Sequence, residues 1–126
     1  MTMTKNHIES LSAAAASLPD CIAKLDALKA EITEQMRSLK QRGLIYATEH
    51  MKDGKYLVLL YPIKAGEPRR REYVGKDPQK MQEAREAIQR AHDYDALADR
   101  AKRLDASIFE GLSKLQDAAR TLARAL

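Results

Sequence analysis

The 126-residue chain is poor in the residues that build disulfides, metal sites and large aromatic cores. It has one cysteine, Cys21, no tryptophan and six aromatic residues, five of which are tyrosine. A single cysteine excludes an internal disulfide and is the usage expected in a reducing compartment. The scarcity of bulky rings argues against a large aromatic core. We therefore expect a cytoplasmic protein with a single domain, residues 1–126.

Long apolar runs and catalytic constellations are also missing. The unbroken apolar runs, such as Leu57–Tyr61, are short, whereas a membrane helix needs about 20 apolar residues. The histidines His7, His50 and His92 lie far apart, and their spacing does not indicate a metal site. The five glycines form no phosphate-binding loop, and no nucleophile–base set can be assembled by spacing. We expect a protein without membrane partner, metal or cofactor, and not an enzyme.

The chain is rich in Ala, Leu, Lys, Arg, Glu and Asp, a composition typical of long helices. From residue 4 to residue 42, apolar residues recur at alternating steps of three and four, which predicts a coiled-coil-like helix. Pro19 interrupts this pattern and predicts a break or a kink. Ser17 is a candidate cap for the helix that restarts there. Gly43 follows two basic residues, Lys40 and Arg42, as is common where helices end.

The segment 44–75 has a different character, because it holds four of the five tyrosines and several β-branched residues. Asp53 and Gly54 stand between two such runs, which is a strong signal for a two-residue hairpin turn. The segment predicts a three-stranded antiparallel meander, with strands Leu44–Met51, Lys55–Ile63 and Arg69–Val74. A sheet this small needs a helix across one face to be stable.

The segment 77–126 predicts a second long helix. Asp77 is a good N-cap, and Pro78 suits the first helical position. A first apolar stripe is formed by Met81, Ala84, Ile88 and Ala91. A second apolar stripe begins at Tyr94. It follows Ala91 by three residues, whereas the alternation of spacings in the first stripe predicts four. Together the segments predict an α+β fold, in which a long antiparallel helical hairpin carries the β-meander at one end.

Both helices present an apolar seam. The predicted seam residues are Ile22, Leu25, Ile32, Leu39, Leu97, Leu104, Ile108, Leu115 and Leu122. Two helices alone leave such a seam partly exposed to water, so we expect a second copy to complete a four-helix bundle. The chain is therefore predicted to be a homodimer.

The positive charge is concentrated in the middle of the chain. Residues 37–80 hold eleven Lys and Arg against five Asp and Glu, a net charge of +6, whereas the remaining residues sum to −2. A segregated basic patch raises the local concentration of polyanions. We expect the partner to be DNA or RNA, bound through the phosphate backbone, or an acidic protein surface.

The Arg69–Arg71 run is the sharpest feature of this basic segment. On a strand, Arg69 and Arg71 would share a face with Tyr73, and Arg70 would point the other way. The guanidinium group of arginine can donate two parallel hydrogen bonds to phosphate oxygens, and tyrosine rings can stack on bases. The predicted binding residues are Arg69, Arg70, Arg71, Lys52, Lys55, Lys64, Lys76, Tyr56 and Tyr73. The alternative is that these charges protect an edge strand from aggregation and that the tyrosines follow strand preference.

Part of the chain resembles a known pattern. The matching residues are Lys55-Tyr56, Tyr61, Arg70-Arg71-Glu72-Tyr73-Val74-Gly75, Ala87-Ile88 and Tyr94-Asp95-Ala96-Leu97. This run resembles small uncharacterised bacterial proteins in which a hairpin ending in Tyr-Val-Gly leads into a long helix. Several of them accompany plasmids, phages or transposable elements. The resemblance covers residues 44–97, implies a mobile-element setting, and supplies no catalytic or binding residues.

Three functional hypotheses follow. The first is a non-enzymatic nucleic-acid-binding accessory protein with a basic β head on a helical stalk. The second is a protein-interaction module, or a small phage or mobile-element inhibitor that binds a host nucleic-acid-handling defence complex. The third is a coiled-coil spacer without a ligand. The charge pattern is equally compatible with the first two hypotheses.

Overall fold

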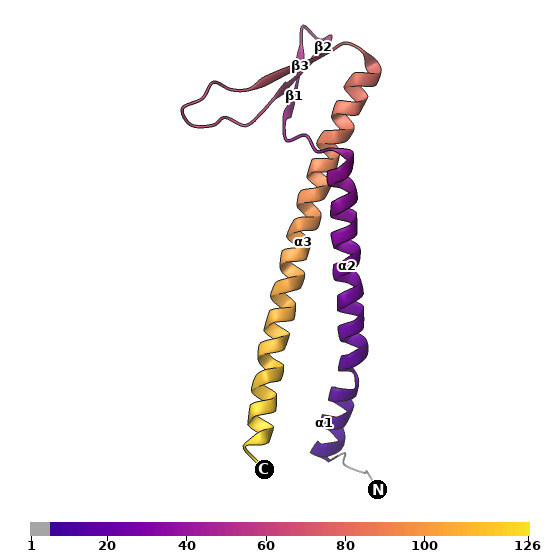
Figure 1. The fold of residues 1–126 in the computed structure, drawn as a ribbon, viewed down its shortest axis with the longest axis vertical. Helices are drawn as coiled ribbons and strands as arrows, with labels where there is room; N and C mark the ends of the chain where they lie inside the picture. The colour runs from indigo at the N-terminus through magenta and orange to yellow at the C-terminus, as the bar shows by residue number, and fades with distance from the viewer. Residues whose placement is uncertain (1–5) are drawn as a thin grey trace.

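The computed structural model describes residues 6–126 and has the α+β class that the sequence predicted (Figure 1). Residues 4 and 5 of the first predicted helix lie outside the described residues. In chain order the elements are α1 His7–Ala16, α2 Leu18–Arg42, β1 Thr48–Lys52, β2 Tyr56–Leu60, β3 Arg71–Gly75 and α3 Pro78–Ala123.

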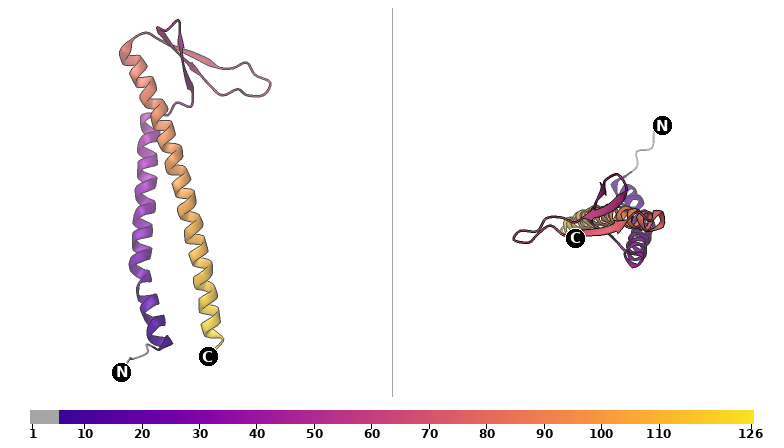
Figure 2. Two further views of the ribbon diagram at one scale, coloured as in Figure 1. Left: turned by 180° about the vertical axis from the view of Figure 1, so that it is seen from behind. Right: turned by 90° about the horizontal axis from the view of Figure 1, so that it is seen from above.

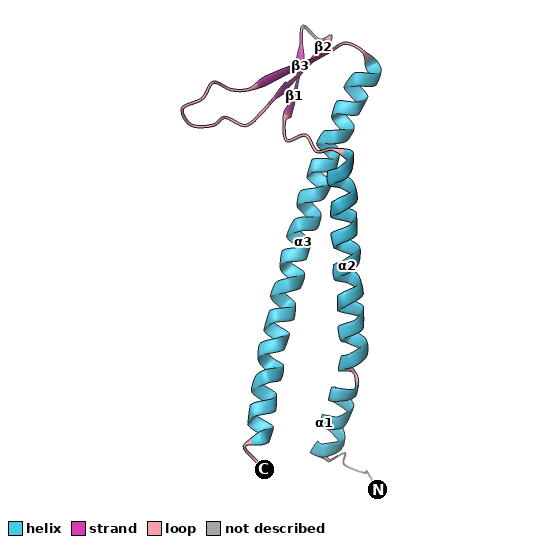
Figure 3. Ribbon diagram, viewed as in Figure 1, coloured by secondary structure: helices cyan, strands magenta, loops and turns pink. Residues whose placement is uncertain are grey.

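The two long helices set the shape of the molecule. α2 contacts α3 and runs beside it in the opposite direction, and the sheet lies at one end of the pair (Figure 3). The helices separate toward the other end, where α1 begins and α3 finishes (Figure 2). Coiled-coil packing along the whole length of the pair stays a prediction. Within residues 6–126, no helix has the length and apolar character needed to cross a bilayer; the cytoplasmic location stays a prediction.

The predicted break near Pro19 is confirmed, but the predicted cap is wrong. α1 ends at Ala16 and α2 begins at Leu18, so Ser17 separates them. Ser17 keeps helical backbone angles (φ −78°, ψ −15°), and its hydroxyl donates back to the Ala14 carbonyl at 2.8 Å. Because a capping residue needs extended angles to reach the next turn, this side chain cannot cap α2.

The three-stranded antiparallel meander is confirmed, with the order β1-β2-β3. The turn between β1 and β2 contains Asp53 and Gly54, as predicted, with φ angles of +55° and +67°. Lys55 also belongs to the turn, so three residues separate the strands and the prediction of two was wrong. Two successive positive φ angles define the tight hairpin turn that matches strand twist. The Lys55 amide closes this turn by donating to the Lys52 carbonyl at 3.1 Å.

The strands are shorter than predicted, and the reasons differ at the two ends. Residues 44–47 are not part of β1; here the Ile45 amide donates to the Ala87 carbonyl of α3 at 3.2 Å. Residues 61–70, which we call the finger, connect β2 to β3 and project from the sheet (Figure 1). The finger contains Pro62 and Pro68, which lack the amide that a strand ladder requires. Only the Tyr61 amide extends the ladder, donating to the Arg70 carbonyl at 3.0 Å.

The core lies between the sheet and the first turns of α3. Leu57 and Leu59 of β2 are fully buried against Ala84 of α3. Partly buried side chains surround these three, namely Ile45, Ala47, Tyr61, Val74, Met81 and Ile88. α3 therefore supplies the helix that a sheet of this size needs on one face.

The end of α2 is attached to α3, and this attachment places the sheet. Gly43 follows α2 with φ +102°, a region that favours glycine. The half-buried Arg90 of α3 donates to the Gly43 carbonyl at 2.8 Å and to the Arg42 carbonyl at 3.2 Å. A cation at these carbonyls satisfies groups that a helix end leaves without partners. The chain therefore leaves α2 at a fixed point on α3.

Candidate nucleic-acid interface

One face of the sheet is packed on α3, and we call the other the open face. Side chains alternate between the two faces along a strand. Because Leu57 and Leu59 point to α3, the residues at alternate positions belong to the open face, and the strand register extends this to β1 and β3. The open face carries Thr48, His50 and Lys52 from β1, Tyr56, Val58 and Leu60 from β2, and Arg71 and Tyr73 from β3. Within residues 6–126, no helix covers it (Figures 1 and 2).

The charges on the strands are sorted between the two faces. The open-face strand positions include Lys52 and Arg71 and no acidic residue. Among the described residues, neither of these two cations forms an ion pair. The acidic strand residues are Glu49 and Glu72, and both belong to the α3 face.

Both of these acids have a partner. Arg85 of α3 donates from Nε to a carboxylate oxygen of Glu49. The Tyr61 hydroxyl donates to a carboxylate oxygen of Glu72 at 2.8 Å. Both acidic strand residues therefore lie on the helix side, and the charged strand residues of the open face other than His50 are both cations, Lys52 and Arg71.

Two tyrosines form an aromatic pair on the open face. The ring centroids of Tyr56 and Tyr73 are 6.0 Å apart, and the ring planes are tilted by 36°. Tyr56 is half-buried, whereas Tyr73 is 64% exposed. The half-buried Val58, which pairs with Tyr73 in the register, lies at the centre of the face. The face thus combines an apolar centre with cations on both edge strands.

The three consecutive arginines do not share one strand, so the predicted alternation is wrong at Arg69 and Arg70. Only Arg71 lies in β3; the other two belong to the finger. The Arg69 Nε donates to the Tyr61 carbonyl at 3.1 Å, and the Arg70 guanidinium lies over the Tyr61 ring at 4.3 Å from its centroid. Tyr61 thus positions two cations, a contact that sequence spacing does not predict.

Burial and hydrogen bonding raise the pKa values of two tyrosines. Burial, together with the hydrogen bond to Glu72, raises the pKa of Tyr61. Burial also raises the pKa of Tyr46, whose hydroxyl donates to Asp95 of α3 at 2.9 Å. Both hydroxyls therefore stay protonated at neutral pH and remain donors.

The remaining predicted binding residues lie outside the strands. Lys55 is in the turn between β1 and β2, Lys64 is in the finger, and Lys76 follows β3; all three are exposed. The structure thus brings the predicted cations to one end of the molecule. His50, which the sequence analysis did not include among the binding residues, shares the open face with them.

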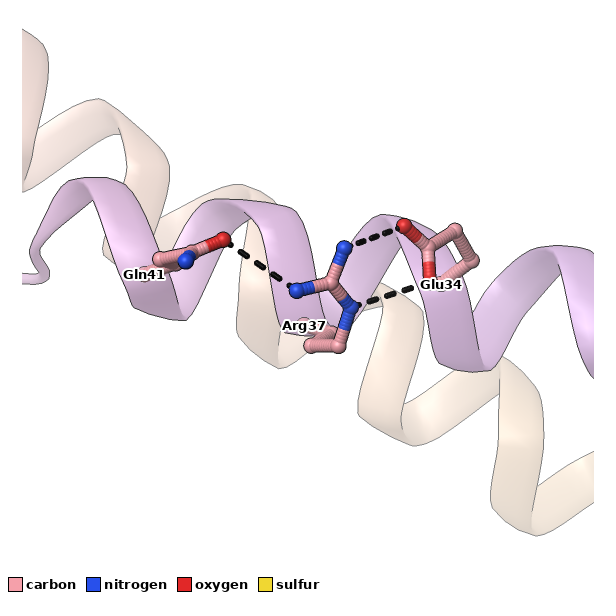
Figure 4. A network of polar contacts seen from close by, with 3 residues as sticks. All are labelled: Glu34, Arg37 and Gln41. Carbon is pink, nitrogen blue, oxygen red and sulfur yellow. Dashed lines mark hydrogen bonds and ion pairs between the residues drawn. The ribbon is translucent and has the colours of Figure 1, made fainter.

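One cation of the basic segment is neutralised on α2. Arg37 donates to both carboxylate oxygens of Glu34, at 2.6 and 3.0 Å, and to Gln41 at 3.2 Å (Figure 4). The Arg37 guanidinium lowers the pKa of Glu34, through hydrogen bonding first and charge second. Arg37 therefore adds little to the basic patch, whose charge lies around the sheet.

The predicted seam residues fall into two groups. Ile32 is buried, and those that are half-buried are Leu25, Leu39, Leu97, Leu104 and Ile108. The exposed ones are Ile22, Leu115 and Leu122, which lie toward the end where the helices separate. An ion pair from Lys29 to Asp105 at 3.1 Å links the two helices among the buried and half-buried residues.

No cluster of three potential metal-ligating side chains occurs in the part of the chain that the structure describes. Comparisons with protein-family models, curated proteins and solved structures found no match to this chain. What the fold and the site define is an α+β protein with an open, basic and partly aromatic sheet face.

Proposed function

We propose that this chain is a non-enzymatic nucleic-acid-binding accessory protein whose open face and finger contact a DNA or RNA backbone. The observation that supports this most is the sorting of charge on the sheet. The acids Glu49 and Glu72 are paired on the α3 side, while Lys52 and Arg71 stand without ion pairs on a face that no described helix covers. Arginine and lysine on an uncovered surface are the groups that bind phosphates.

The finger adds further cations at the same end of the molecule. Arg69 and Arg70 are held at its base by Tyr61, which reduces the conformational freedom they lose on binding. The proposed phosphate contacts are Arg69, Arg70, Arg71, Lys52, Lys55, Lys64 and Lys76. The resemblance to mobile-element proteins adds a setting in which small nucleic-acid-binding proteins are common.

We also propose that two copies associate through the far ends of their helices. Large apolar side chains stay exposed there, namely Ile8, Leu11, Ile22, Phe109, Leu112, Leu115 and Leu122. A symmetrical contact between two copies would cover these side chains in both chains. Coiled-coil packing between the copies is part of this proposal.

The salt dependence of binding tests the proposed function. Affinity for a short duplex is measured by retardation between about 50 and 200 mM salt, where each lost phosphate contact flattens the log–log slope by about 0.9. The triple variant R69A/R70A/R71A should flatten the slope by up to about three units. R100A/R120A/R124A removes the same charge from the part of α3 away from the sheet and from the residue that follows it, and should leave the slope unchanged.

A second variant is needed because Arg69 and Arg70 also make contacts within the chain, so the triple variant could lose binding by misfolding. K52Q/R71Q removes two open-face cations that form no described ion pair, and should flatten the slope by up to about two units. Absence of binding to any nucleic acid at about 50 mM salt would reject the proposal. Capture of an acidic protein from nuclease-treated lysate, with no binding to nucleic acid, would support the protein-interaction alternative instead.

A further inference from the structure

We infer that the open face binds single-stranded nucleic acid, with a base stacked on the ring of Tyr73. This inference rests on the proposed function and specifies its ligand. Its basis is that the open face is not uniformly cationic. Its centre is aromatic and aliphatic, and its cations stand on the two edge strands.

Tyr73 is suited to stacking because its ring is both exposed and supported. The ring is 64% exposed, and the half-buried Tyr56 packs against it at 6.0 Å between centroids. Tyr56 limits the rotation of the neighbouring ring, so less freedom is lost when a base stacks on it. Stacking on a tyrosine tolerates any base, because every base has a π-face.

The apolar centre favours a single strand over a duplex. Val58 and Leu60 lie on β2 between the two edge strands, and both are half-buried. A duplex keeps its base faces stacked inside and presents phosphates and groove edges, which gain nothing from an aliphatic surface. An unstacked strand presents base faces, which can cover these side chains.

The cations are placed to hold the backbone of such a strand. Lys52 pairs with Tyr56 across β1 and β2, and Arg71 pairs with Leu60 across β2 and β3. The two cations therefore stand diagonally across the face, because Tyr56 and Leu60 are the two ends of β2, about 13 Å apart along the strand, and the edge strands are about 10 Å apart. Phosphates beside these cations would leave the intervening bases over the centre of the face.

The test compares single-stranded DNA and RNA probes, each on the order of 12 nucleotides, with a duplex of the same sequence. Because the chain has no tryptophan, its emission comes from tyrosine, and stacking on Tyr73 should quench it. We expect the single strands to bind on the order of tenfold more tightly than the duplex. Y73A should lower single-strand affinity by about tenfold and leave duplex affinity unchanged, while Y73F should bind as the unaltered chain does.

Two results would overturn this inference. One is a duplex that binds as tightly as the single strands, and the other is Y73A and Y73F binding alike. If K52Q/R71Q still flattens the salt slope in either case, the proposed function stands and only the single-strand inference fails. If no probe binds at all, both fail together.

Discussion

Tyr61 connects more groups of the site than any of the predicted binding residues does. Its carbonyl accepts from Arg69, its hydroxyl donates to Glu72, and its ring lies under Arg70. It also packs against the buried core. The Tyr61 side chain, in the first residue of the finger, therefore couples the core to the finger, and its substitution should affect both stability and the position of Arg70.

Two substitutions separate these roles of Tyr61. Y61F keeps the ring and removes only the hydrogen bond to Glu72, so the free energy of unfolding should fall by about 1 kcal/mol. Y61L removes the ring as well, with its packing and cation–π contact, and should cost about 2 kcal/mol. Urea unfolding measures both, with Y73F as the control at an exposed ring. Equal losses in Y61F and Y61L would contradict a structural role for the ring.

The raised pKa of Tyr61 predicts a loss of stability in alkali. The folded chain holds this proton more tightly than the unfolded chain, so the stabilising contribution is complete below the unfolded pKa. It is lost as the pH rises through the higher folded pKa, because the protonated hydroxyl is the donor to Glu72. A tyrosinate absorbance titration should show that Y61F lacks part of the step at highest pH. An unchanged upper step in Y61F would refute this assignment.

At the scale of the element, the periodicity of apolar residues predicted the two long helical segments. The structure explains the one irregular step in that periodicity, which lies between the two apolar stripes of α3. The first stripe of α3, with Ala84 and Ile88, packs on the sheet, whereas the second, with Leu97 and Leu104, lies beside α2. The step of three between the stripes marks the place where α3 changes partner. Near it, Arg90 attaches the end of α2 to α3.

The ends of the strands could not be predicted, because they depend on contacts from other elements. Residues 44–47 have strand-forming side chains, but α3 supplies a partner for the Ile45 amide. Arg69 and Arg70 were predicted to lie in the third strand. Pro62 and Pro68 prevent the hydrogen-bond ladder between β2 and β3 from continuing into the finger. The Asp53-Gly54 turn was predictable because its signal is entirely local.

The packing between α2 and α3 should depend on the half of the helices nearest the sheet. Ile32 is the one buried residue of α2, at 2% exposure, so I32A should lower the free energy of unfolding by about 2–4 kcal/mol. I22A is the matched control on the same helix, because Ile22 is 56% exposed, and should cost less than about 1 kcal/mol. Thermal unfolding followed by circular dichroism measures both. Equal costs would mean that the separated ends of the helices also pack in solution.

At the scale of the whole molecule, the helices separate the two proposed activities. The predicted binding cations lie at the sheet, whereas most of the exposed large apolar side chains lie in α1, at the start of α2 and in the last part of α3. The sequence predicted this gathering of charge, since the segment 37–80 carries the entire basic excess. It did not predict the sorting of charge between the two faces of the sheet, which depends on Arg85 and Tyr61 reaching the acids Glu49 and Glu72.

The proposed association through the far ends predicts a dimer that single substitutions weaken. L115D and L122D each place a charge on an exposed apolar surface, so each should lower the mass in solution toward one chain. Analytical ultracentrifugation over a range of concentrations measures this. S10D is the control, because it adds a negative charge at an exposed polar position of α1. A chain that sediments as a monomer at every concentration would contradict the association.

Hydrogen exchange with and without a saturating single-stranded oligonucleotide tests the central claim most directly. The account predicts slower amide exchange across β1, β2, β3 and the finger, residues 48–75, and no change in residues 100–123 of α3. Protection spread along the helices, or confined to them, would contradict an interface on the open face of the sheet.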